Sequence, residues 1–183
     1  MTTTELFVEL IIIGAGSFGA AVLVVLGVFG YRWIPLSQVR SVQVLVGALP
    51  VVYVLGIVTD RIADALFKRW SIIIRSSAYP NEDAYHLARA VVYQKSPFRD
   101  LFEYSRSRLR IARGWAVNCV LILVGFDVFV GIQLPRATPR LTIAIFGSAV
   151  LILLLIGNVG AWMLLTKSEV ENIRRQERIV KQL

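Results

Sequence analysis

The chain has 183 residues, of which 56% are hydrophobic and only 17% are charged, and its formal net charge is +8. An average soluble domain carries about 25% charged residues. Here the apolar residues are gathered in long runs instead of recurring at helix or strand spacing, which excludes an ordinary soluble domain and indicates a membrane protein. Cys119 is the only cysteine, so no intrachain disulfide is possible, and we expect it to act as a small buried hydrophobe.

Four apolar runs are long enough to cross a membrane, because a helix rises about 1.5 Å per residue and the hydrocarbon core is about 30 Å thick. The runs form two pairs, separated by a polar, arginine-rich segment. We therefore predict an all-α integral membrane protein with a cytoplasmic helical stalk between its second and third spans. The first segment, residues 1–58, contains spans at 6–29 and 42–58, and the stalk follows at 59–114. The third segment, residues 115–165, contains spans at 115–132 and 141–165. A charged cytoplasmic helix at 166–183 completes the prediction.

The distribution of basic residues predicts the orientation. Sixteen of the twenty Lys and Arg residues lie in the stalk and the C-terminal tail, and four lie in the two short links. The positive-inside rule then places both termini and the stalk in the cytoplasm, and we expect a location in the plasma (inner) membrane. The first span disagrees locally, because Glu5 and Glu9 precede it and Arg32 follows it. Since no basic residue precedes this apolar run, we expect a retained span and not a cleavable signal.

The stalk has the residue spacing of amphipathic helices. We expect the second span to continue as a helix to about residue 74, and Asn81 to be the N-cap of a helix over residues 82–94. The simplest partners for the apolar face of this helix are the extensions of the second and third spans. That face comprises Ala84, Leu87, Ala88, Val91 and Val92. Ser96 and Pro97 predict the start of another helix, which can run without a break into the third span.

One side of this last stalk helix is basic. The candidate residues are Arg99, Arg106, Arg110 and Arg113. Guanidinium groups bind phosphates and carboxylates through paired hydrogen bonds, so anionic lipid, a nucleotide or an acidic cytoplasmic protein is a possible ligand. The alternative is that these arginines only anchor the topology and form salt bridges with Asp60, Asp64 and Glu103. Nucleic acid is not expected, because the aromatic residues lie on the apolar side of the helix and not between the arginines.

Three of the polar residues inside the predicted spans, Asp127, Asn118 and Asn158, are candidates for a functional role. A carboxylate at the depth of Asp127 costs a few kcal/mol unless it is protonated or partnered. Asp127 is therefore a candidate for a pore or proton relay, with a structural pair to Arg136 or Arg140 as the alternative. For Asn118 and Asn158 we expect hydrogen bonds between helices.

Small residues four positions apart let helix backbones approach closely. Such pairs are Ala15 with Gly19, Gly16 with Ala20, and Gly157 with Ala161. They can pack the helices of one chain or form an interface between subunits. Residues 14–19 also spell the glycine pattern of dinucleotide-binding folds, but no acidic residue follows at the required distance, so we interpret the match as chance.

No combination of residues predicts catalysis, a metal site or a cofactor. His86 is the only histidine, and the neighbouring carboxylates of Asp60 and Asp64 do not by themselves make a metal site. We predict a homo-oligomeric channel or pore-like membrane effector, embedded in a bilayer with anionic lipid, whose stalk senses or docks a cytoplasmic signal. The alternative is a non-conducting anchor or adaptor that binds a cytoplasmic protein, and a membrane-embedded enzyme is a distant third.

Overall fold

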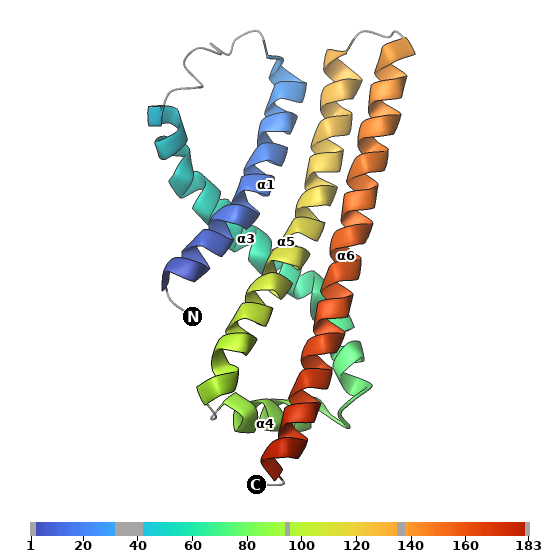
Figure 1. Ribbon diagram of the computed structural model, residues 1–183. Coiled ribbons are helices and arrows are strands. Elements are labelled where there is room, and N and C mark those ends of the chain that lie inside the picture. Colours follow the sequence, from blue (N-terminus) through green and yellow to red (C-terminus); the bar gives the residue numbers. More distant parts are fainter. Residues whose placement is uncertain (1–2, 32–41, 94–95, 135–137, 182–183) are drawn as a thin grey trace.

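The computed structural model describes residues 3–31, 42–93, 96–134 and 138–181. Within these ranges the chain is entirely helical, which confirms the predicted all-α class (Figure 1). The helices are α1 (Thr3–Phe29), α3 (Val42–Ser76), α4 (Glu82–Tyr93), α5 (Ser96–Gln133) and α6 (Thr138–Lys181).

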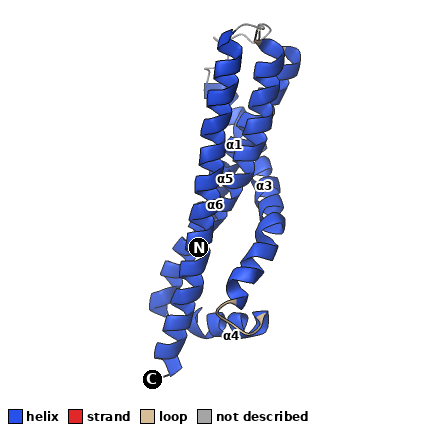
Figure 2. Ribbon diagram, turned by 90° about the vertical axis from the view of Figure 1, so that its right-hand side faces the viewer, coloured by secondary structure: helices blue, strands red, loops and turns tan. Residues whose placement is uncertain are grey.

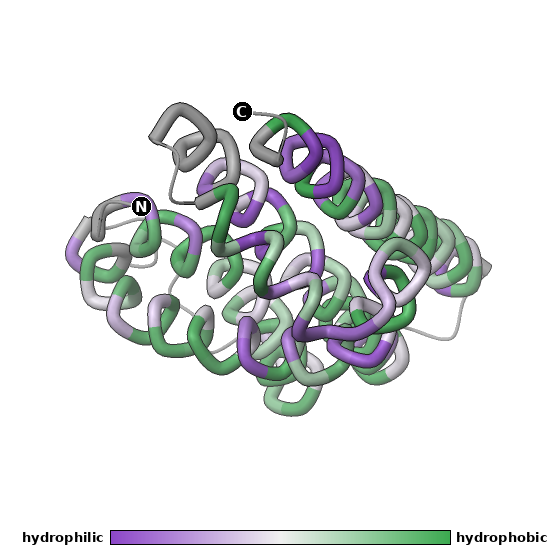
Figure 3. Tube along the Cα trace, turned by 90° about the horizontal axis from the view of Figure 1, so that it is seen from below, coloured by the Kyte–Doolittle hydropathy of each residue, from purple (hydrophilic) through white to green (hydrophobic). Residues whose placement is uncertain are grey.

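Four of these helices, α1, α3, α5 and α6, are long and apolar enough to cross a membrane. In two views, α1, α5 and α6 run side by side, α3 crosses obliquely, and α4 lies at the lower end (Figures 1 and 2). Seen from that end, α6 changes from hydrophilic near the C-terminus to hydrophobic farther along (Figure 3). At about 1.5 Å per residue, the 44 residues of α6 span about 66 Å, more than twice the thickness of a hydrocarbon core.

The predicted continuity of the long helices is confirmed. Helix α3 continues to Ser76, α5 runs without interruption from Ser96 to Gln133, and α6 includes the charged tail as far as Lys181. The expected N-cap is also present, because the side-chain oxygen of Asn81 accepts a hydrogen bond of 2.8 Å from the backbone N–H of Ala84. Helix α1 passes through the whole glycine pattern at residues 14–19, which rules out the strand and turn that a dinucleotide site requires.

Helix α4 packs chiefly against α6, and this corrects the expected partners. The core at the lower end comprises Tyr79, Tyr85, Ala88, Val92, Val170 and Ile173. Leu87 was expected on the buried face but is 69% exposed, whereas Tyr85 is only 1% exposed. The helix is rotated from the expected orientation because the ring of Tyr85 packs edge-to-face against Tyr79, with 5.6 Å between the centroids.

Two glycines create the close crossing of α1 and α3. A Cβ atom added at Gly14 would lie 2.8 Å from the carbonyl carbon of Val52 and closer still to its oxygen. A Cβ atom at Gly56 would meet the Leu10 carbonyl in the same way, again at 2.8 Å from the carbon. No side chain fits at either position, so the two backbones are in direct contact. Neither glycine has a small residue four positions away on the contacting face, so the spacing of small residues did not predict this pair.

The small residues that the sequence singled out divide into two groups. Gly16 and Ala20 are buried between helices of the chain, where Gly16 faces the side chain of Asn118. Ala15 and Ala161 are exposed, and a Cβ atom at Gly19 or Gly157 would meet nothing within 4 Å. The second group therefore leaves two outward faces, on α1 and α6, open to another surface.

Candidate functional site

A buried polar cluster joins three of the apolar helices. The Asn118 side chain on α5 is fully buried, and its amide nitrogen donates a hydrogen bond of 2.7 Å to the Ile13 carbonyl of α1. Its amide oxygen accepts a hydrogen bond of 2.7 Å from the Ser17 hydroxyl, which lies 2.6 Å from the hydroxyl of Thr59 on α3. Since both ends of the Asn118 amide are bonded, this cluster holds the helices together and leaves no open polar surface.

Asp127 lies elsewhere, on an exposed face of α5. Its carboxylate accepts a hydrogen bond of 2.8 Å from the Ser148 hydroxyl of α6. Arg140, one of the expected partners, instead donates to the carbonyl of Gly131. The other, Arg136, is outside the described residues. Asp127 is nine positions from the Asn118 cluster, about 13 Å along the helix, so the candidates on α5 do not form one site.

Asn158 is partly exposed on α6. Its amide donates a hydrogen bond of 2.8 Å to the Leu154 carbonyl of its own helix and lies 3.9 Å from the sulfur of Cys119. Cys119 is buried, as expected. The contact of Asn158 with α5 is therefore weaker than the interhelix hydrogen bonds of Asn118.

An ion-pair network ties α1 and α3 to the arginines of α5. The guanidinium of Arg110 lies 2.9 Å from the carboxylate of Glu9 and 3.8 Å from that of Asp60. The guanidinium of Arg113 lies 3.1 Å from Asp60 and 2.5 Å from Asp64. The salt bridges with Asp60 and Asp64 are two of those predicted from the sequence as the alternative to ligand binding by the arginines. The buried Glu9, only 4% exposed, was missed as a partner.

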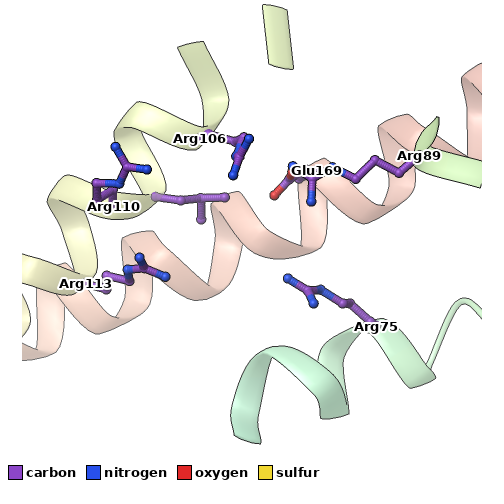
Figure 4. Close-up of a pocket in the computed structure, with 7 residues that line it drawn as sticks. Arg75, Arg89, Arg106, Arg110, Arg113 and Glu169 are labelled. Carbon is purple, nitrogen blue, oxygen red and sulfur yellow. The ribbon is translucent and has the colours of Figure 1, made fainter. Parts of the chain in front are cut away.

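Beside this network the lower ends of four helices enclose a cavity of about 100 Å³. Guanidinium groups from α3, α4 and α5 converge there around a carboxylate from α6 (Figure 4). The lining residues are Arg75, Arg89, Arg106, Leu109, Arg110, Arg113 and Glu169. We call this cavity the arginine pocket. Three candidates from the sequence, Arg106, Arg110 and Arg113, lie in it, whereas the side chain of Arg99 is outside the described part of the chain.

Among the described residues that line the arginine pocket, Glu169 is the one acid, and it is 8% exposed. Burial raises the pKa of the Glu169 carboxyl above its usual 4.5. The guanidinium groups of Arg89, Arg75 and Arg106 lower this pKa, but burial is the larger effect. The carboxyl is therefore easier to protonate than an exposed glutamate.

The arginines of the pocket differ in how many of their N–H donors are engaged by other side chains. Arg75 lies 3.5 Å from the Glu82 carboxylate and stacks on the ring of Tyr85. The Nε atom of Arg113 is buried and has no hydrogen-bond partner among the described residues. Arg106 is exposed, and within the described ranges it forms no hydrogen bond or ion pair. The pocket thus holds guanidinium donors that the described side chains do not satisfy.

The described residues contain no group of three or more His, Cys, Asp or Glu side chains that could hold a metal ion. Asp60 and Asp64, the neighbouring carboxylates in the sequence, both face Arg113. No protein-family model matches the chain, and no curated protein or solved structure matches it.

Proposed function

We propose that the protein is a homo-oligomeric channel or pore-like effector of the plasma (inner) membrane, with its termini and stalk in the cytoplasm. Helix lengths support this placement. The distances from Glu9 to Phe29 and from Arg113 to Gln133 are each 20 residue steps, about 30 Å, which equals the thickness of a hydrocarbon core. The ion-pair network then lies at the cytoplasmic boundary, where Arg110 neutralises Glu9 and removes the local conflict of the first span with the positive-inside rule.

The observation that carries the proposal is the exposed carboxylate of Asp127. In this placement it lies 14 residues from Arg113 and six from Gln133, so it is inside the hydrocarbon core, about 9 Å from the outer boundary. Its described partner is a single hydroxyl, that of Ser148. A carboxylate facing lipid at this depth costs several kcal/mol, and the cost falls when other subunits or a water-filled path surround it. Assembly with Asp127 on an inner surface therefore offers it a favourable environment.

Surfaces suited to assembly are present on the protomer. None of the residues in the most apolar window of α6 is buried within one chain. On α6, Ala161 is exposed and Gly157 has no neighbouring atom within 4 Å of an added Cβ. Gly19 on α1 likewise has no such neighbour. Because small residues permit close contact between helices, these faces are suited to pairing between subunits.

Ion flux from liposomes containing the purified protein tests the proposal. Wild-type protein should release a trapped ion or dye faster than empty liposomes, and Asp127→Asn should change the rate or the ion preference. Asp83→Asn is the matched control, since Asp83 is an exposed acid in the first turn of α4, away from the apolar helices. Its flux should equal that of the wild type.

The mass of the protein in lipid discs provides the second measurement. Wild-type flux no greater than that of empty liposomes, across ionic conditions and both orientations, would contradict the channel. An oligomer that conducts nothing but retains a cytoplasmic protein would instead support the anchor or adaptor. A monomer with neither flux nor partner would contradict both functions.

A further inference from the structure

We propose that the arginine pocket binds one phosphate group, supplied either by the headgroup of an anionic phospholipid or by a soluble phosphate compound. The inference concerns binding alone, so it does not depend on whether the protein conducts ions. It rests on the size of the pocket, its unused donors, the buried carboxyl within it and its depth.

The size of the pocket limits the ligand. Its volume is about 100 Å³. Pockets for drug-sized ligands usually measure about 300–1,000 Å³. One phosphorus atom with its four oxygens suits the smaller volume, whereas a nucleoside with its phosphates does not. The nucleotide considered from the sequence is thus disfavoured as a ligand enclosed by this pocket.

The donors of the pocket suit a tetrahedral anion. A guanidinium presents five N–H donors in a planar fork, which matches two oxygens of a phosphate. Arg106 retains its fork, and Arg113 keeps its buried Nε donor after pairing with two aspartates. A buried donor without a partner is unfavourable, so an oxygen atom that reaches it stabilises the site. The carboxylates that pair with Arg110 and Arg113 are not lining residues, and they hold these two side chains in place.

Glu169 makes the charge of the pocket adjustable. When it is ionised, it competes with an incoming anion for the three arginines that interact with it, Arg75 from α3, Arg89 from α4 and Arg106 from α5. Arg110 and Arg113 pair with other carboxylates. When it is protonated, the competing charge is gone and its hydroxyl can donate to a phosphate oxygen. A bound phosphate places negative charge beside this carboxyl, whose pKa burial already raises, so binding should favour the protonated form of Glu169. For a phosphate group of fixed charge, binding should therefore strengthen as the pH falls.

In the proposed placement, the side of the pocket nearest the hydrocarbon core lies at the depth of the phospholipid headgroups. Arg113 lies at the cytoplasmic boundary of the hydrocarbon core, and Arg106 lies seven residues below it, about 10 Å along α5. The polar layer on each side of a bilayer is about 5–7 Å thick. A lipid phosphate can therefore reach the side of the pocket formed by Arg110 and Arg113, whereas the exposed Arg106 lies just beyond the polar layer and gives access from solvent.

The test uses the full chain in two preparations. In discs of phosphatidylcholine alone, inorganic phosphate is titrated at constant ionic strength and the shift in melting temperature is recorded. In discs that also contain phosphatidylglycerol, the lipid retained by the protein after detergent extraction is measured by mass spectrometry. We compare wild type, Arg106→Gln, Glu169→Gln and the control Arg108→Gln. Arg108 is also an exposed arginine of α5, but it lies outside the pocket and stacks on Tyr104.

Arg106→Gln should weaken binding about tenfold, the effect of losing one charge-assisted contact. Glu169→Gln should strengthen it several-fold at neutral pH and remove much of its pH dependence. Arg108→Gln should bind as the wild type does. A phosphate-dependent shift in phosphatidylcholine discs identifies a soluble anion as sufficient, while selective retention of phosphatidylglycerol alone identifies the lipid as the source. The proposal is overturned if neither probe binds, or if Arg108→Gln loses as much affinity as Arg106→Gln.

Discussion

Replacing Gly56 by alanine should separate α1 from α3. The new methyl carbon would lie 2.8 Å from the Leu10 carbonyl carbon, whereas carbon atoms pack favourably at about 3.5–4.0 Å, so the backbones must move apart by roughly 1 Å. Overpacking of this kind typically costs about 1–3 kcal/mol. The same movement would stretch the 2.6 Å contact between Ser17 and Thr59, each three residues along its helix from the crossing, at a further cost of about 0.6 kcal/mol.

Alanine also gains up to about 1 kcal/mol over glycine in a helix interior. The expected net loss in the free energy of unfolding for Gly56→Ala is therefore about 1–3 kcal/mol. Gly47→Ala is the matched control on the same helix, because a Cβ atom there would meet nothing within 4 Å. It should be neutral or slightly stabilising.

The assay is reversible unfolding in a mild detergent, titrated with a denaturing detergent and followed by circular dichroism. Gly14→Ala should behave like Gly56→Ala, since its added atom meets the Val52 carbonyl. If Gly56→Ala proves as stable as Gly47→Ala, the two backbones are not in direct contact and the reasoning is refuted.

Four further predictions concern hydrogen bonds and charges. Asn118→Ala removes two interhelix hydrogen bonds and should lower the free energy of unfolding by about 1–2 kcal/mol in the same titration. Glu9→Gln leaves Arg110 without its nearest carboxylate and should lower the free energy of unfolding by about 1–3 kcal/mol. Adding Arg110→Gln should recover part of that loss. A double-mutant cycle that shows no coupling between the two positions would contradict the ion pair. Burial and the neighbouring Glu177 raise the pKa of Tyr79 from 10.0 to about 12. The contribution of Tyr79 to stability is therefore present below pH 10 and is lost as the pH rises through about 12, a loss that Tyr79→Phe should not show. Equal pH profiles of stability for the two proteins would refute this prediction. Because the pKa of Glu169 is raised in the folded state, its contribution to stability is present below its usual pKa of 4.5 and is lost as the pH rises through the higher folded value. Glu169→Gln should therefore be at least as stable as the wild type at neutral pH. A variant clearly less stable than the wild type would contradict the expected direction of the pKa shift.

Features encoded within a single helix could be predicted from the sequence. The absence of a breaker after Ser96 and Pro97 predicted a helix continuous with the third span, and α5 is continuous from Ser96 to Gln133. Asn81 was recognised as an N-cap because capping depends on residues only a few positions apart. Asp60 and Asp64 were foreseen as partners for arginine, since opposite charges at the same boundary attract one another.

Features that depend on how helices rotate against each other could not be predicted in this way. Gly14 and Gly56 face one another only because of the angle at which α1 crosses α3, and no spacing within either helix encodes that angle. The rotation of α4 that buries Tyr85 depends on the ring of Tyr79, which lies before the helix begins. The arginine pocket combines residues from four helices. The residue spacing within any one helix therefore could not predict that Arg75 and Glu169 belong to it.

The pair between Glu9 and Arg110 also has a consequence for biosynthesis. Its two residues are 101 positions apart, and chains are synthesised at about 5–20 residues per second, so roughly 5–20 s pass between the appearance of the acid and that of its partner. During this interval the first helix has an unneutralised carboxylate and lacks α5, the helix that buries it. The N-terminal helix therefore reaches its final packing only after α5 is made, and a nascent chain released earlier retains an exposed acid that the mature protein conceals.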